Sequence, residues 1–242
     1  MKRLLLLSGM ILTGVLAIAP GAQASNQDAA AKCSGTATGR TIRGDLVVPR
    51  GGSCRLIDST VRGDVEIRGD GYFQATDTTV RGDVRGKRAQ TIFIEGGSTV
   101  KGNVKADRTS QVFLFDSTIR GWIGISRADA TVNVCGMTVQ GYIEVERSGR
   151  DILIGDPLAV GCAGNLVTRG NIEVKDNFTD VELVIRGNTI KRGDLEVNRN
   201  SGRSGKFVEG NIGGRVLTCK GNDTPFTASG NTGWDKKSGQ CS

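Results

Sequence analysis

The sequence contains no histidine and is poor in aromatic residues and prolines, with two tryptophans, two tyrosines and four prolines among 242 residues. Its six cysteines form no Cys-x-x-Cys motif, which together with the missing histidine argues against a metal site or a redox-active pair of thiols. Beyond the first apolar run, no segment approaches the ~20 apolar residues that a membrane span needs. We therefore expect no metal, no cofactor and no membrane span.

Residues 1–24 have the pattern of a secretory signal peptide. Lys2 and Arg3 precede an apolar run, and the small residues Ala22 and Ala24 suit cleavage before Ser25. We therefore expect a secreted chain, periplasmic or extracellular, of 242 − 24 = 218 residues. Six cysteines in an exported chain predict three disulfides.

Glycine is abundant, at 36 residues, and one set of glycines marks a repeat. The hexapeptide TVRGDV occurs at residues 60–65 and again at 79–84, and aligning the chain on its glycine gives nine copies. The repeat glycines are Gly44, Gly63, Gly82, Gly102, Gly121, Gly141, Gly170, Gly193 and Gly214. An apolar residue follows each of them two positions later, and in the first six copies another lies two positions before. This period of two predicts a strand with one buried face.

A unit of about 20 residues cannot bury such a strand alone, but stacked copies can. We therefore predict an all-β, single-stranded parallel β-helix (a β-solenoid, expected to be right-handed) of about nine rungs of 19–23 residues. The predicted boundaries are an N-terminal cap at 25–40, repeats at 41–219 with an insertion around 151–168, and a C-terminal cap at 220–242. Because polar caps block end-to-end pairing, a monomer is preferred to a filament.

The cysteine spacing favours one pairing. Cys33 to Cys54 and Cys219 to Cys241 each span about one rung, so these pairs should staple neighbouring rungs near the two ends. Cys135 to Cys162 spans the one long interval, between Gly141 and Gly170, where a cross-link would hold the insertion.

The outward residues of the repeat carry an uneven charge. Between residues 81 and 127 there are nine basic and four acidic residues, a difference of +5, equal to the 7 − 2 = +5 of the chain without Lys2 and Arg3. Elsewhere, the Asp residues that follow the repeat glycines are expected largely to neutralise the Arg residues that precede those glycines. In two copies Trp122 and Tyr142 replace that Asp or Asn.

Aromatic rings beside a basic surface are typical of a site for an anionic polymer. The candidate contact surface comprises Arg81, Arg85, Lys101, Lys105, Arg120, Trp122 and Tyr142. Its expected partner is an anionic polysaccharide or another cell-envelope polymer. Nucleic acid is not expected, because no recognised binding module is present. The alternative is that the two aromatic residues only cover the side of the rod where the insertion folds back.

Two other functions are alternatives to a non-catalytic binding or structural module. A polysaccharide lyase of β-helix type would need carboxylates for calcium or charge neutralisation and a basic residue to take the proton, and a hydrolase would need paired carboxylates. The best column of carboxylates is Asp58, Asp77 and Asp116. These residues fall at expected corners, where aspartate caps turn amides, so no catalytic residue is assigned.

A self-assembling filament or an adhesin is the remaining alternative. Arg-Gly-Asp occurs five times, and four of these lie on the repeat glycine, which marks them as a product of the repeat. Only residues 68–70 fall outside the register and stay a candidate for receptor display.

The repeat phrases STVRGDVEI, STVKGNVKA and MTVQGYIEV, with the ending VLTCKGNDTPFTASGNTGWDKKSGQC, resemble a group of bacterial secreted parallel β-helix repeat proteins. More distantly, the chain is similar to the bactofilins, which are cytoskeletal β-helical polymers. The resemblance implies the fold but no catalytic residues that could be carried over. Bactofilins lack signal peptides and disulfide-capped ends, so the resemblance does not imply filaments here.

Overall fold

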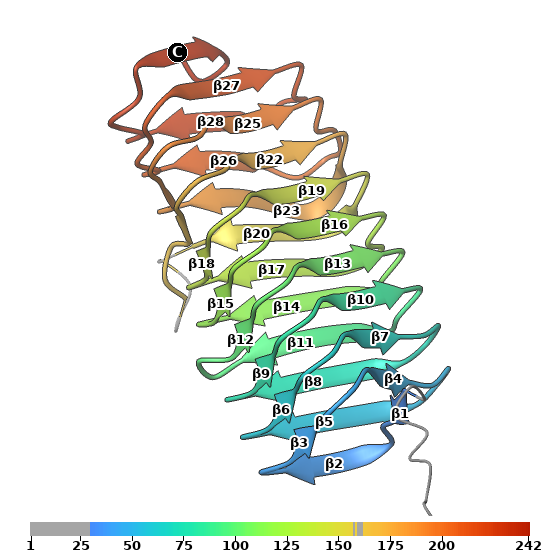
Figure 1. Ribbon diagram of the computed structural model, residues 1–242. Helices are drawn as coiled ribbons and strands as arrows, with labels where there is room; N and C mark the ends of the chain where they lie inside the picture. Colours follow the sequence, from blue (N-terminus) through green and yellow to red (C-terminus); the bar gives the residue numbers. More distant parts are fainter. Residues whose placement is uncertain (1–29, 157, 159–161) are drawn as a thin grey trace, which may run out of the picture.

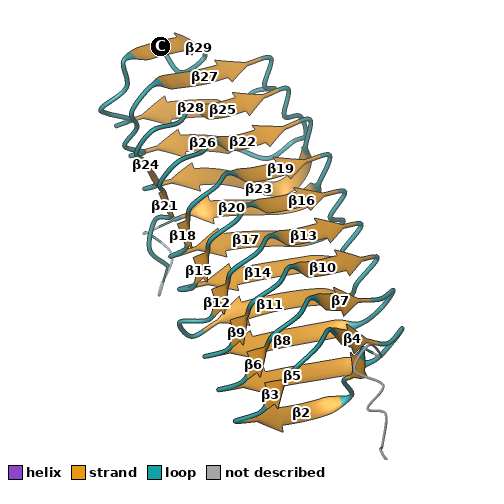
Figure 2. Ribbon diagram, in the orientation of Figure 1, coloured by secondary structure: helices purple, strands orange, loops and turns teal. Residues whose placement is uncertain are grey.

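The computed structural model describes residues 30–156, 158 and 162–242, and every regular element in this part of the chain is a β-strand. The strands form three parallel sheets, called A, B and C, that run the length of a rod (Figures 1 and 2). The predicted signal peptide lies outside the described residues.

Each sheet collects every third strand along most of the chain. Sheet A contains β1 (Ala31–Lys32), β4 (Leu46–Val48), β7 (Val65–Ile67), β10 (Val84–Lys87), β13 (Val104–Asp107), β16 (Ile123–Ser126), β19 (Ile143–Glu146), β22 (Ile172–Lys175), β25 (Leu195–Asn198), β27 (Val216–Lys220) and β29 (Lys236–Gly239). Sheet B contains β2 (Gly35–Thr38), β5 (Ser53–Ile57), β8 (Tyr72–Thr76), β11 (Thr91–Glu95), β14 (Gln111–Phe115), β17 (Thr131–Cys135), β20 (Gly149–Gly155), β23 (Phe178–Arg186), β26 (Lys206–Glu209) and β28 (Phe226–Ser229). Sheet C contains β3 (Thr41–Ile42), β6 (Thr60–Val61), β9 (Thr79–Val80), β12 (Thr99–Val100), β15 (Thr118–Ile119), β18 (Thr138–Val139), β21 (Leu166–Val167) and β24 (Thr189–Ile190).

The chain passes through sheets A, B and C in turn, and one such passage is a rung. Neighbouring rungs pair in register, so that Val65, Val84 and Val104 lie side by side in sheet A. The ten strands of sheet B correspond to about ten rungs, which confirms the predicted parallel β-solenoid. The segments predicted as caps contribute strands of their own, β1 and β2 at one end and β28 and β29 at the other.

The core is a single column of apolar side chains inside the coil. Val61, Val65, Ile67 and Ile92 have no exposed surface, and their counterparts in successive rungs form one continuous cluster. The alternation that was read from the sequence is therefore the inside and outside of each strand. At ~25 cal/mol per Å², such a column supplies most of the stabilisation of a fold without helices.

The corners between sheets B and C combine a left-handed residue with a buried polar one. In the N-terminal half, Asp58, Asp77 and Asp116 adopt φ values of 43–49°, and each precedes a buried serine or threonine. In the C-terminal half the buried residues are Asn165, Asn188, Asn211 and Asn231, and left-handed glycines, Gly187, Gly210 and Gly230, precede the last three.

The four asparagines form a ladder along the rod. The Nδ2 atom of Asn188 donates to Oδ1 of Asn211 at 2.9 Å and to the carbonyl of Ile154 at 2.7 Å. A second ladder, of Asn177, Asn200 and Asn222, follows the corners between sheets A and B and ends on Oε1 of Gln240 at 3.0 Å. Each buried amide is thus satisfied by the next rung.

All three predicted disulfides are present. Cys33–Cys54 and Cys219–Cys241 join neighbouring rungs near the two ends. Cys135–Cys162 ties strand β17 to the segment that precedes β21, where the long interval adds residues between β20 and β21. Three disulfides indicate a protein of an oxidising compartment.

Candidate binding surface

The period of two predicted a single strand around each repeat glycine. In the structure the repeat glycines lie instead at the corner between sheets C and A. Gly63, for example, separates β6 from β7. A Cβ atom on Gly63 would lie 2.7 Å from the backbone nitrogen of Asp45 in the preceding rung. Gly82, Gly102 and Gly121 meet their preceding rungs in the same way. Glycine persists here because the corners of successive rungs touch.

The Asp or Asn after the glycine bonds to the next rung. Oδ1 of Asp45 accepts the backbone N–H of Asp64 at 2.8 Å, and Oδ1 of Asp64 accepts that of Asp83 at 2.8 Å. Asp83 and Asn103 continue the column by accepting the amides of Asn103 and Trp122. The aspartate of the repeated Arg-Gly-Asp is therefore a structural acceptor, which explains why asparagine can replace it.

The basic residue before the glycine points away from this column. Arg43, Arg62, Arg81, Lys101 and Arg120 occupy five consecutive rungs, and all five are exposed. The backbone N–H groups of the last four donate to carbonyls of the preceding rung at 2.8–2.9 Å, as from Arg81 to Val61. None of the five forms an ion pair with another described residue. The expected pairing with the neighbouring aspartates is thus wrong, and the five residues form what we call the basic edge.

The basic edge is interrupted at Gln140 and resumes beyond it. A hollow of about 290 Å³ opens at this point, lined by Thr138, Gln140, Thr168, Arg169, Lys191 and Arg192. The three cations on its far side are exposed and, within the described residues, take part in no ion pair. The corner between sheets C and A is therefore basic over most of its length.

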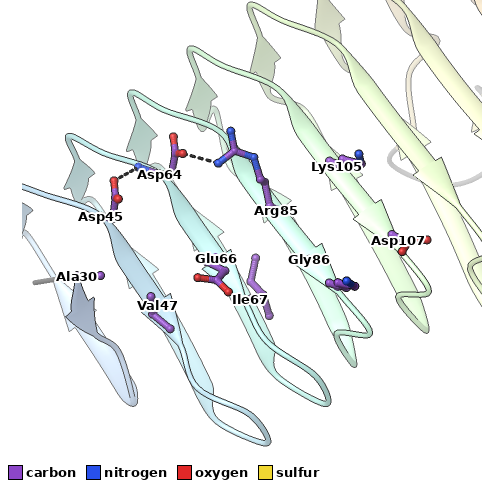
Figure 3. A pocket seen from close by; sticks show the side chains of 11 residues that line it. Ala30, Asp45, Val47, Asp64, Glu66, Ile67, Arg85, Gly86, Lys105 and Asp107 are labelled. Atoms are coloured by element: carbon purple, nitrogen blue, oxygen red, sulfur yellow. Dashed lines mark hydrogen bonds and ion pairs between the residues drawn. The ribbon is translucent and has the colours of Figure 1, made fainter.

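Arg85 and Lys105, the other two predicted cations, lie side by side on the outer face of sheet A. Figure 3 shows Arg85 reaching toward Asp64, with which it is ion-paired, and Asp83 is its second partner. Partial burial raises the pKa of Asp64, but hydrogen bonds from the Asp83 amide and the Arg85 guanidinium outweigh it, so that the pKa lies below its ordinary value. Arg85 is consequently engaged within the protein.

Two hollows cover the outer face of sheet A. One, of about 470 Å³, extends from Asp45 to Lys105 (Figure 3), and the other, of about 400 Å³, lies around Trp122 and Tyr142. Lys105 and Asp107 line both, so the two form one shallow groove along the sheet.

Trp122 and Tyr142 stack on each other, with ring centroids 5.3 Å apart and planes inclined by 5°. Coplanar rings cannot approach so closely, so the two lie face to face and each covers one face of the other. Burial, together with the charges of Glu144 and Glu173, raises the pKa of Tyr142 above its ordinary value. The predicted aromatic surface therefore offers edges and at most one open face per ring.

An acidic column that was not predicted from the sequence lies on strands β19, β22 and β25 of sheet A. Glu144, Glu173 and Glu196 are in register on successive strands. Lys175 forms ion pairs with the first two, and burial plus repulsion from Glu173 and Asp194 raises the pKa of Glu196. The signal was present, because each glutamate lies three positions after a repeat glycine. The outer face of sheet A thus changes from basic at Arg85 and Lys105 to acidic at these three strands.

The alternative candidates lie elsewhere. Asp58, Asp77 and Asp116 are exposed at the corner between sheets B and C, away from the groove on sheet A, and their left-handed backbone accounts for their recurrence. Residues 68–70 are at the corner between sheets A and B. There Arg68 pairs with Glu66 at 3.0 Å and Asp70 pairs with Arg50 at 3.4 Å, so both charges of that tripeptide have partners.

Among the described residues, no group of three or more histidine, cysteine, aspartate or glutamate side chains is placed to hold a metal ion. No helix in the same part of the chain is long and apolar enough to cross a membrane. No family model, curated protein or solved structure matches this chain.

Proposed function

We propose that this chain is an extracellular, non-catalytic binding module that holds an anionic polysaccharide of the cell envelope or its surroundings along the basic edge. The observation that carries the proposal is the run of five exposed cations, Arg43 to Arg120, without an ion-pair partner among the described residues. Their aspartate neighbours are occupied by backbone amides and, at Asp64 and Asp83, by Arg85. The positive charge of the edge is therefore available to a ligand.

The physics of such a surface favours a polymer. One exposed ion pair contributes ~0 to 1 kcal/mol, so a single anion would bind weakly. Five cations on a rigid scaffold act on one chain together, and the cost of ordering them is small because the backbone is fixed by the sheets. Binding should be strongly salt-dependent, because counterions are released from the polymer.

The test is retention of the chain on immobilised polygalacturonate, hyaluronan and uncharged dextran. Retention on the two polyanions is expected at low salt and should fall as salt is added. Replacing Arg81 and Lys101 together (R81E, K101E) should weaken polyanion binding by about tenfold or more, because two attractions become repulsions.

A matched control is R203E with K236E, which changes the net charge equally at exposed sites away from the basic edge. This control should retain most of the affinity. Equal losses of affinity in the two double variants would show that binding depends only on the net charge of the chain. That result would contradict a binding site at the basic edge. Release of unsaturated or reducing sugars during the incubation would show that the chain cleaves the polysaccharide, which would contradict a non-catalytic binding module.

A further inference from the structure

Sheet C places a column of threonines next to the basic edge. Thr41, Thr60, Thr79, Thr99, Thr118 and Thr138 are partners in register on six successive strands. The residue after each threonine is apolar and packs inward, fully buried except for the partly buried Ile42. The residue after that is the cation of the basic edge or, in the sixth strand, Gln140. Each of the first five rungs therefore presents one hydroxyl and one positive charge on the same side.

This pattern has the period of the rungs. Strands in a sheet lie about 4.8 Å apart, so the threonine hydroxyls and the cations form two parallel rows with that repeat. The register is maintained from Thr41 to Thr138 without a bulge. Such a surface fits a polymer whose charged groups repeat at about the spacing of the rungs. It fits polymers with a different spacing of charges less well.

We infer that the ligand is a polyuronate, a polysaccharide with one carboxylate on every sugar, bound parallel to the rod with about one sugar per rung. This inference rests on the proposed function. Each carboxylate would meet an Arg or Lys of the basic edge, with guanidinium groups able to donate two parallel hydrogen bonds. Ring hydroxyls on the other side of the sugar would meet the threonine column.

The length of the uninterrupted run sets the footprint. Five rungs, from Arg43 to Arg120, carry a cation, and Gln140 follows at the edge of the 290 Å³ hollow. An oligomer of five uronic acids would fill this run. A polymer with a carboxylate on every second sugar would place only about three charges on the same five rungs.

The experiment measures affinity of the whole chain for oligogalacturonates of two to six residues, in about 0.1 M salt. Affinity should rise with each residue up to five, and the sixth, which would face Gln140, should add little. Hyaluronan oligomers with the same number of carboxylates have a charge on every second sugar, and they should bind about fivefold or more weakly, because fewer charges meet the edge at once.

Variants test the two rows separately. Q140R should extend the rise in affinity to the sixth residue by adding a sixth cation in register. T79V with T99V should lower oligogalacturonate affinity severalfold without changing thermal stability, since valine keeps the strand shape. The control T131V alters an outward threonine of sheet B and should leave affinity unchanged.

The outcomes separate the two proposals. If both oligomer series bind equally at equal charge, the polyuronate register is wrong while polyanion binding stands. If neither series binds, both proposals fail.

Discussion

At the residue scale, the repeated Arg-Gly-Asp divides into three unrelated roles. The glycine allows successive rungs to touch, the aspartate accepts an amide from the next rung, and the arginine faces solvent. A receptor ligand would need the arginine and aspartate together on a projecting loop. Here the tripeptide results from stacking.

The first prediction compares two glycines of the same motif. At Gly82 a Cβ atom would lie 2.7 Å from the carbonyl oxygen of Gly63, whereas at Gly44 nothing lies within 4 Å. Gly82→Ala should therefore lower the free energy of unfolding by about 3 kcal/mol through overpacking. Gly44→Ala should change it by less than about 0.5 kcal/mol. Urea denaturation measures both, and equal effects would show that rung contact is not the cause.

At the element scale, strand β26 is an exception to the apolar core. Lys206 has no exposed surface and is in register with the buried Leu183. Its Nζ atom donates to the carbonyls of Gly202 and Ser204, each at 3.0 Å. Burial lowers the pKa of Lys206 below 10.5, an effect that attraction to Asp223 opposes.

A pH dependence follows from this strand. Because the folded pKa is the lower one, the unfolded chain binds more protons between that pKa and 10.5, so stability should rise with pH across this window. Below the folded pKa the cost of burying the charge is fully present. Unfolding free energies measured in urea from pH 7 to 10 should increase for the wild type more than for Lys206→Met. Parallel curves for the two chains would contradict the assignment.

The two asparagine ladders show another limit of reading elements from sequence. Asn165, Asn188, Asn211 and Asn231 lie 23, 23 and 20 residues apart, a spacing visible in the sequence. The burial of these asparagines could not be read from the sequence, because asparagine is usually exposed. Only the stacking of the corners provides hydrogen-bond partners for each side-chain amide in neighbouring rungs.

At the scale of the whole molecule, the charges differ from one corner of the rod to the next. The corner between sheets C and A carries the basic edge. The corner between sheets A and B carries Arg88, Arg108, Arg127 and Arg147 together with Asp70 and Asp176, and Arg127 and Arg147 are ion-paired. The corner between sheets B and C carries Asp58, Asp77 and Asp116. The two basic corners flank sheet A, so the +5 excess of residues 81–127 is a belt around the side of the rod that includes sheet A.

The ends of the rod lead to a prediction about assembly. The last strand of sheet A, β29, carries Lys236 and Lys237, and the first, β1, has two residues. Short and lysine-bearing edge strands resist pairing with other chains. Sedimentation velocity should therefore give one monomeric, elongated species at low and at high salt. Growth in size with concentration would favour the filament instead.

Several residues of the candidate site could be predicted from the sequence. Their separation into an exposed basic edge and an ion-paired or stacked face of sheet A could not. Arg81, Lys101 and Arg120 share the basic edge as their spacing from the repeat glycines indicated. Arg85 belongs to another face and is ion-paired, and the two aromatic residues cover each other. Which charges stay free depends on side-chain directions at a corner, which a period of two does not specify.

The spacing of the repeat was enough to predict the rungs, the apolar columns and the three disulfides, because a unit of about 20 residues can bury its valines and isoleucines only by stacking on its neighbours. The positions of the bends and the contacts between polar groups became visible only in the folded rod. The corners bring together residues that are 19 to 29 positions apart in the sequence. There the carboxylate of Asp45 or Asp64 accepts a backbone N–H, while the arginine two positions before that aspartate forms no ion pair among the described residues. The surface we propose for binding arises from that difference.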